Sequence, residues 1–169
     1  MPDEAGFIPV AKPWLGEQEV EALKRPILSG WVTQGPEAAA FEREFAAYCG
    51  VRYGVATHNG TVALHLVLAA LGLGPGDEVV TTPTTFAATV NVIIHAGATP
   101  VLADVDDTLT LSPAAVRAAL SPRTRAVMPV HMCGAMADLD VLQGLVREKG
   151  LLLLEDACQA VGGTYRGRA

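Results

Sequence analysis

The stretch EVVTTPTTFAATVNVIIHAGATPVLADV, residues 78–105, contains a strand, a helix and a second strand in succession. Residues 78–82 are rich in β-branched side chains and stop at a proline, which is typical of a short buried strand. Apolar residues recur at helical spacing over 85–97, where a glycine ends the helix, and 99–105 are again strand-like. This order predicts two parallel strands joined by a crossover helix.

The same alternation continues on both sides of this stretch. The expected elements are helices at 17–30, 36–50, 60–72, 112–120 and 138–150, and strands at 53–57, 125–130 and 151–156. Pro26 is expected to kink the first helix or to shift its start, because proline has no backbone N–H. The alternation predicts an α/β fold with a largely parallel sheet that helices cover on both faces.

Composition excludes several classes of protein. Half of the 169 residues are hydrophobic, the formal net charge is −6, and the scattered lysines and arginines form no basic stripe for nucleic acid. The N-terminus shows no signal-peptide pattern, and no apolar run is long enough for a membrane span. The three cysteines, Cys49, Cys133 and Cys158, are too widely spaced for a zinc motif or a disulfide framework. We therefore expect a cytoplasmic protein with reduced thiols and no metal site.

Ligands of open α/β sheets bind beyond the carboxyl ends of the strands, so the residues that follow each predicted strand are the candidates. Asn59, Gly60 and Thr61 open the helix at 60–72, whose N-terminus offers free N–H groups to a phosphate. An ordinary helix cap is the alternative. Neither a dinucleotide-binding glycine fingerprint nor a P-loop is present.

Two further strand ends carry candidates with two interpretations each. Phe86 could stack on a flat ligand or pack in the core, and Asn91 lies in an otherwise apolar helix, where it needs a polar partner. His131 follows the strand at 125–130 and could donate to a ligand or transfer a proton. It could equally be a core histidine bonded to the backbone.

The last predicted strand, LLLLED, ends in two acids, and Gln159 follows. Asp156 could cap a following helix and Glu155 could face solvent. A carboxylate opposite a phosphate cradle, with an aromatic ring to one side, instead suggests a planar heteroaromatic ligand such as pyridoxal phosphate. Asp156 would keep the ring nitrogen protonated. The attraction between two opposite charges about 4 Å apart is worth roughly 4 kcal/mol at an effective dielectric of 20. Gln159 could then bond the ring hydroxyl.

Along essentially its whole length, the sequence resembles the DegT-type (DegT/StrS) sugar aminotransferases, which are pyridoxal-phosphate enzymes of fold type I. The most specific blocks are GDEV, the PTTFAAT segment, PVH and EDACQAVGG. The resemblance implies that Gly60 and Thr61 bind the cofactor phosphate and that Phe86 stacks on the ring. It likewise implies that Asp156 pairs with the pyridine nitrogen and Gln159 with the ring oxygen.

The resemblance also suggests residues near the substrate. His131 matches a histidine close to the active site, and Gln34 lies in the segment WVTQG (31–35), which matches a loop near the substrate or the dimer side. Asn91 is a further candidate there. The complete enzyme would be a homodimer that aminates a nucleotide-linked keto-sugar, with glutamate as the amino donor, in amino-sugar and polysaccharide biosynthesis.

Residues 1–169 would then form the N-terminal part of the large, cofactor-binding domain, a three-layer sandwich, with the remainder and a small domain downstream. The family's Schiff-base lysine lies in an SF…K block beyond residues 165–167, and Lys12, Lys24 and Lys149 do not match it. We therefore expect the chain to be inactive by itself.

Three alternatives stay open. Family members with histidine in place of that lysine are dehydratases. The chain could also be a cofactor-free binding or regulatory remnant. A nicotinamide-dependent enzyme is disfavoured because the glycine fingerprint is missing.

Overall fold

The structure is a computed structural model that describes residue 9 and residues 11–168. Its centre is a four-stranded parallel sheet with the strand order β2-β1-β3-β4. The strands are β1 (Glu78–Thr81), β2 (Thr99–Leu102), β3 (Thr124–Val127) and β4 (Leu152–Leu153). In register, Val80 lies opposite Val101 of β2 and Val127 of β3. The predicted parallel sheet is confirmed.

Six α-helices and one 3-10 turn are present among the described residues. They are α1 (Glu17–Ser29), α2 (Pro36–Tyr48), α3 (Gly60–Ala70), α4 (Ala88–His95), α5 (Pro113–Ala119), α6 (Leu139–Lys149) and the turn η1 (Met132–Gly134). Side chains cap several starts: Asn59 accepts from the Val62 N–H, and Asp138 accepts from the Val141 N–H. Gly150, in the left-handed conformation, ends α6.

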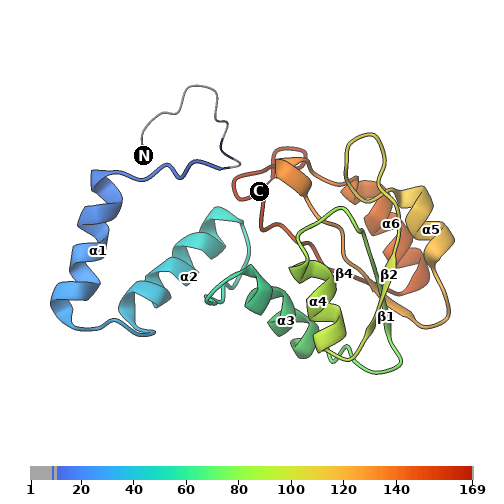
Figure 1. Cartoon of the computed structure of the whole chain (residues 1–169), viewed down its shortest axis with the longest axis horizontal. Coiled ribbons are helices and arrows are strands. Elements are labelled where there is room, and N and C mark those ends of the chain that lie inside the picture. Colours follow the sequence, from blue (N-terminus) through green and yellow to red (C-terminus); the bar gives the residue numbers. More distant parts are fainter. Residues whose placement is uncertain (1–8, 10, 169) are drawn as a thin grey trace.

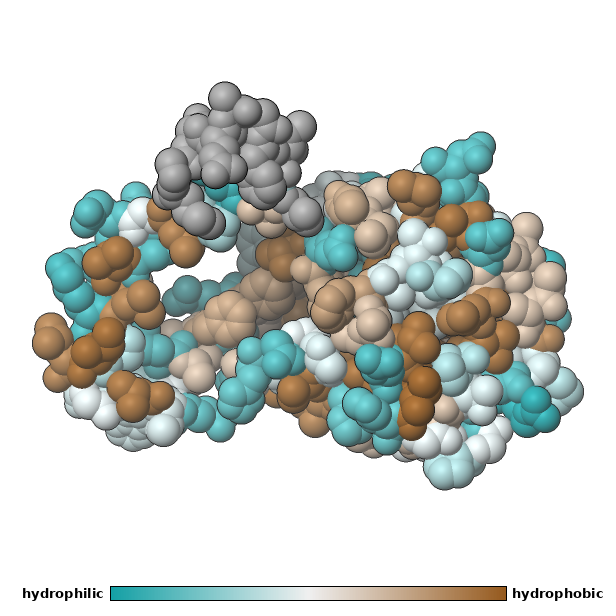
Figure 2. All heavy atoms as spheres, in the orientation of Figure 1, coloured by the Kyte–Doolittle hydropathy of each residue, from teal (hydrophilic) through white to brown (hydrophobic). Residues whose placement is uncertain are grey.

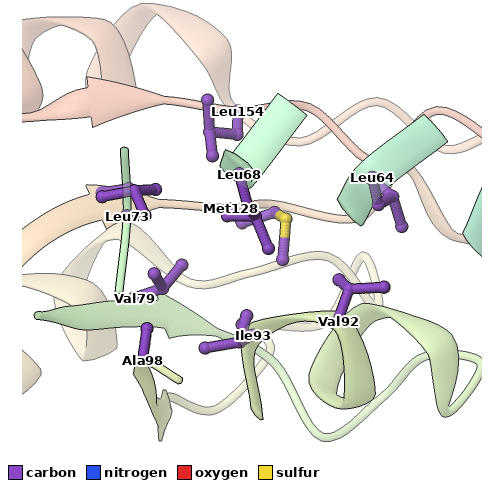
Figure 3. Close-up of a cluster of buried hydrophobic side chains, with 10 residues drawn as sticks. Leu64, Leu68, Leu73, Val79, Val92, Ile93, Ala98, Met128 and Leu154 are labelled. Carbon is purple, nitrogen blue, oxygen red and sulfur yellow. The ribbon is translucent and has the colours of Figure 1, made fainter. Parts of the chain in front are cut away.

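The sheet lies between two layers of helices. Because neighbouring strand residues point to opposite faces, Val79 joins the core under α3 and α4, whereas Val80 joins the core under α5 and α6. Figure 3 shows the first of these clusters, in which side chains from α3, α4 and the strands point toward one another. The predicted three-layer sandwich is confirmed.

The strand predicted at residues 53–57 is wrong. No strand forms there, and Tyr53 and Val55 are exposed. The segment is attached to α2 instead: the Ala56 N–H donates to Glu42 Oε1 at 2.9 Å, and a Cβ on Gly54 would lie 2.6 Å from the Glu42 carbonyl oxygen. An apolar, β-branched run becomes a strand only where a neighbouring strand can pair with it.

The strands predicted at 125–130 and 151–156 are shorter than expected, but their pairing continues. Beyond β3 and β4, the Asp156 N–H donates to the Pro129 carbonyl and the His131 N–H donates to the Asp156 carbonyl, at 2.9 and 3.0 Å. Pro129 interrupts the ladder because it has no N–H of its own. Both chain segments therefore reach the same edge of the sheet.

The two N-terminal helices, α1 and α2, bury few of their side chains. Pro26 lies inside α1, which begins at Glu17, so of the two expectations for Pro26 the shifted start is wrong and the kink stays a prediction. Among the described residues, α1 buries none of its side chains and α2 buries only Ala46. Figure 1 shows α1 standing away from the α/β body, and Figure 2 shows hydrophobic side chains gathered over it.

Candidate active site

A cavity of about 240 Å³ opens at the carboxyl edge of the sheet. It lies where the start of α3, the segment before α4 and the chain beyond β3 and β4 meet. Its lining consists of Asn59, Gly60, Thr61, Leu64, Thr85, Phe86, Ala88, Thr89, Val130, Asp156, Cys158 and Gln159. The structure therefore brings together all five residues that the sequence predicts as cofactor ligands, although they lie almost 100 positions apart along the chain.

The first turn of α3 forms one end of the cavity. Asn59 caps the helix through its side chain, which accepts from the Val62 N–H at 3.0 Å. The backbone N–H groups of Gly60 and Thr61 and the Thr61 hydroxyl donate to no residue that the structure describes. These donors, together with the positive end of the helix dipole, suit an anion such as a phosphate.

Gly60 is required by close approach rather than by its backbone angles. A Cβ at this position would lie 2.5 Å from the Sγ atom of Cys158. The start of α3 therefore packs directly against the segment that follows β4, and both residues line the cavity.

Asp156 also lines the cavity and is only 5% exposed. Its Oδ2 accepts from the Thr89 hydroxyl at 2.7 Å, and its Oδ1 accepts from the Cys158 N–H at 3.2 Å. Among the described residues no lysine or arginine lines the cavity. A buried carboxylate without a cation is costly, so a ligand that brings a positive charge to Asp156 would be stabilised.

The Asp156 carboxylate affects the pKa of the neighbouring Cys158 thiol. Burial, together with the hydrogen bond and negative charge of Asp156, raises the pKa of the Cys158 thiol from its ordinary 9.0 to about 11. The thiol therefore stays protonated at neutral pH and is a poor nucleophile.

The orientation of the Gln159 amide follows from its contact with the turn η1. Its Oε1 accepts from the Cys133 N–H at 3.0 Å, which leaves the amide NH₂ as the group free to donate. Cys133 is in the left-handed conformation (φ 52°), unusual for a residue with a side chain. Strain of this kind is found where a loop must present a group in one direction.

Phe86 lies at the mouth of the cavity, just before α4 begins at Ala88. Phe86 is 72% exposed, so the alternative of core packing is wrong. The helix predicted at 85–97 includes Phe86, but α4 begins two residues after it. An exposed ring beside a cavity can cover the face of a flat ligand.

Three candidate residues lie elsewhere. His131 is fully buried, its Nδ1 accepts from the Ala137 N–H, and its Nε2 lies 2.9 Å from Glu155 Oε2. Asn91 is exposed on α4, so it does not need the protein partner expected for it. Gln34 is exposed in the connection between α1 and α2. None of the three lines the cavity.

Sequence reasoning missed Thr89 as a member of the site. Thr89 is fully buried in α4 and orients Asp156 through its hydroxyl, which also lies 2.7 Å from the Thr85 hydroxyl. The sequence did contain a signal for Thr89, which lies on the same apolar helix as Asn91. A hydroxyl that is buried on such a helix needs a hydrogen-bond partner. Which partner it finds depends on how α4 packs on the sheet.

Comparison with known proteins identifies the family. The model of the DegT/DnrJ/EryC1/StrS aminotransferase family matches residues 13–169. The chain belongs to this family. It is 47% identical over 163 residues to the spore coat polysaccharide biosynthesis protein SpsC of Bacillus subtilis, covering 96% of this chain and 42% of SpsC.

Solved structures agree with the family assignment. DesV of S. venezuelae is 44% identical with a TM-score of 0.85, over 89% of this chain and 41% of DesV. The putative sugar aminotransferase Spr1654 of Streptococcus pneumoniae, in its PMP form, is 32% identical with a TM-score of 0.91, over 95% of this chain and 45% of Spr1654. Spr1654 has also been solved in a PLP form. The chain thus spans less than half the length of these relatives.

Two further kinds of feature are absent from the described residues. No group of three or more histidine, cysteine, aspartate or glutamate side chains is placed to hold a metal ion. None of the described helices combines the length and the apolar character that crossing a membrane requires.

Proposed function

We propose that this chain supplies the cofactor-binding part of a pyridoxal-phosphate-dependent aminotransferase that acts on a nucleotide-linked keto-sugar. The observation that carries the proposal is the cavity itself. It joins an exposed aromatic ring to a helix N-terminus and a buried carboxylate, and no described residue accepts from the helix's free N–H groups or brings a cation to the carboxylate. These three features complement a phosphate, a flat ring and a basic ring nitrogen.

Each wall of the cavity has a role in this proposal. Gly60 and Thr61 hold the phosphate through backbone N–H groups and a hydroxyl. Phe86 covers one face of the ring, and Gln159 donates from its amide to the ring oxygen. When bound, the cofactor supplies an electron sink for the carbanion formed during amino transfer.

Asp156 keeps a proton on the ring nitrogen. At a separation of about 4 Å and an effective dielectric of 20, the pair is stabilised by roughly 4 kcal/mol, which corresponds to about three pKa units. The hydrogen bonds from the Thr89 hydroxyl and from the Cys158 N–H fix the direction of the Asp156 carboxylate. A positively charged ring withdraws electrons more strongly than a neutral one.

The amine that would bind the cofactor covalently is not at this cavity. The sequence has three lysines, Lys12, Lys24 and Lys149, and none of them lines the cavity. We therefore expect the chain alone to bind the cofactor through non-covalent contacts and not to transaminate. In the whole protein we propose glutamate as the amino donor, a homodimer as the working form, and a product used in polysaccharide biosynthesis, as the name of SpsC suggests. Free thiols at all three cysteines suit the reducing cytoplasm.

The test is a calorimetric titration of the chain with pyridoxamine 5′-phosphate, which needs no lysine. We expect Asp156→Asn to weaken binding at least about tenfold, since the lost charge pair is worth more than 1.4 kcal/mol. Asp140→Asn is the matched control, because Asp140 is exposed and pairs with Arg166 away from the cavity. If Asp156→Asn bound the cofactor as tightly as the unmodified chain, the proposal would be wrong.

A further inference from the structure

We infer that the His131–Glu155 pair, which lies outside the cavity, positions the residues that bind the cofactor ring. The inference rests on the proposed function and extends it to two residues outside the cavity. His131 is fully buried and does not line the cavity, so it has no direct access to a ligand there. Its effect must pass through Asp156 and Gln159.

Hydrogen bonds determine the state of the His131 ring. Nδ1 accepts from the Ala137 N–H at 3.2 Å, so this nitrogen carries a lone pair and the ring proton is on Nε2. Nε2 then donates to Glu155 Oε2 at 2.9 Å. Both ring nitrogens are used, which gives the imidazole one tautomer and one orientation.

The first route from this pair leads to Asp156. Glu155 and Asp156 are adjacent, so in an extended chain their side chains point to opposite sides. The backbone of Asp156 is held on both sides, since its N–H donates to the Pro129 carbonyl and its carbonyl accepts from the His131 N–H. Attaching the Glu155 side chain to His131 adds a third point, which fixes the rotation of the strand end and thereby the direction of the Asp156 carboxylate.

The second route leads to Gln159 through the turn η1. Within this turn, the Gly134 N–H donates to the His131 carbonyl and the Ala135 N–H donates to the Met132 carbonyl. The His131 ring holds the chain that leaves the turn, because its Nδ1 accepts from the Ala137 N–H. This turn presents the Cys133 N–H to Gln159 Oε1. One imidazole therefore supports both polar contacts to the ring, but neither contact to the phosphate.

Because His131 supports the contacts to the ring but not those to the phosphate, the two kinds of ligand contact can be tested separately. Glu155→Ala should weaken binding of pyridoxamine 5′-phosphate about tenfold, the size expected when a buried partner is left unsatisfied. Binding of inorganic phosphate, followed by the amide shifts of Gly60 and Thr61, should change less than about twofold because α3 is untouched. Glu155→Gln keeps an acceptor for Nε2–H and should restore most of the affinity. Glu148→Ala, which removes an exposed ion-paired carboxylate, is the control and should leave both affinities unchanged.

An equal loss for both ligands would indicate a general loss of structure and would overturn the inference, as would no loss for either. Glu155→Asp, which is one methylene too short, is a second variant with the same expectation should Glu155→Ala not fold. A mutant cycle adds a readout that a purely structural role would not move. In a Gln159→Ala, Asp156→Asn background, Glu155→Ala should weaken pyridoxamine 5′-phosphate binding less than about twofold, and full additivity would contradict the inference. Imidazole ¹⁵N shifts check the premise, because the two hydrogen bonds require the Nε2–H tautomer of His131, and the Nδ1–H tautomer would also overturn the inference.

Discussion

Helices α1 and α6 illustrate the difference between the two regions of the molecule. Both are amphipathic, with apolar residues at helical spacing on one side. Leu142 and Leu145 of α6 are almost completely buried against the sheet, whereas Leu23 and Ile27 of α1 are 60% and 64% exposed. An amphipathic pattern thus predicts a helix equally well in both regions, but only a partner surface turns its apolar side into core.

The candidate site follows the same division. Every residue that lines the cavity lies between Asn59 and Gln159, in the α/β body, and none comes from α1 or α2. The body holds the cavity because its strand ends and helix starts are fixed by two packed cores. Five measurements can sharpen or break this comparison.

The largest effect is expected from Leu68→Ala. Leu68 is fully buried between α3 and the sheet, next to Met128 (Figure 3). Removing its side chain should lower the free energy of unfolding by about 2–5 kcal/mol, from lost burial plus the cavity left behind. Urea denaturation followed by circular dichroism measures it. A loss below about 1 kcal/mol would mean that α3 is not held by this core.

A smaller loss is expected from Gly60→Ala, because the new Cβ would meet Cys158 Sγ at 2.5 Å. Overpacking of this kind costs about 1–3 kcal/mol of unfolding free energy. Adding Cys158→Ala removes the sulfur and should recover most of that loss. Gly144→Ala is the control, since a Cβ at that position meets nothing within 4 Å. A lack of rescue would place the strain elsewhere.

Thr89→Val tests the support of the carboxylate. Asp156 Oδ2 would lose the hydroxyl that lies 2.7 Å away, and an unsatisfied buried acceptor costs about 1–3 kcal/mol, with the lower half expected because water can enter the cavity. Thermal unfolding and pyridoxamine 5′-phosphate affinity should both decrease. Thr89→Ser keeps the hydroxyl and should behave like the unmodified chain in both assays.

Alkaline pH should have a smaller effect through Cys158. Its pKa is raised in the folded chain, so the thiol contributes stability that is complete below its ordinary pKa of 9.0 and is lost as the pH rises through about 11. Alkylation of Cys158 by iodoacetamide should keep accelerating with pH up to that value. In Asp156→Asn the acceleration should level off at a lower pH. An identical pH profile in the two chains would remove Asp156 as a cause of the raised pKa.

The smallest effect is expected from Leu23→Ala in α1. Its side chain is 60% exposed and covers no core, so the free energy of unfolding should change by no more than about 0.5 kcal/mol. Urea denaturation beside Leu68→Ala makes the comparison direct. A loss comparable to that of Leu68→Ala would show that the apolar side of α1 is covered in solution.

Most of the fold could be predicted from the sequence. In the α/β body, the spacing of apolar residues that predicts each helix or strand also places those residues in the core. Residues 85–97 and 138–150 contain α4 and α6 because their apolar spacing matches a helix that packs on a sheet. Residues 53–57 have a strand's composition, yet Glu42 of α2 takes the Ala56 N–H. Pairing depends on which chain segment lies alongside, and composition alone does not contain that information.

The sequence by itself determined the residue types of the candidate site, since the carboxylate, the amide, the aromatic ring and the small residues of the helix start each follow a predicted element. Only the tertiary structure decided which of them share one cavity. Gly60 lies beside the segment that follows β4 because α3 packs on the sheet with its first turn against Cys158, and Thr89 joins the site because its hydroxyl reaches Asp156. His131 lies within the same edge but is turned away from the cavity, because its two ring nitrogens find Ala137 and Glu155. A side chain's neighbours are set by packing across the sheet, which local sequence cannot encode.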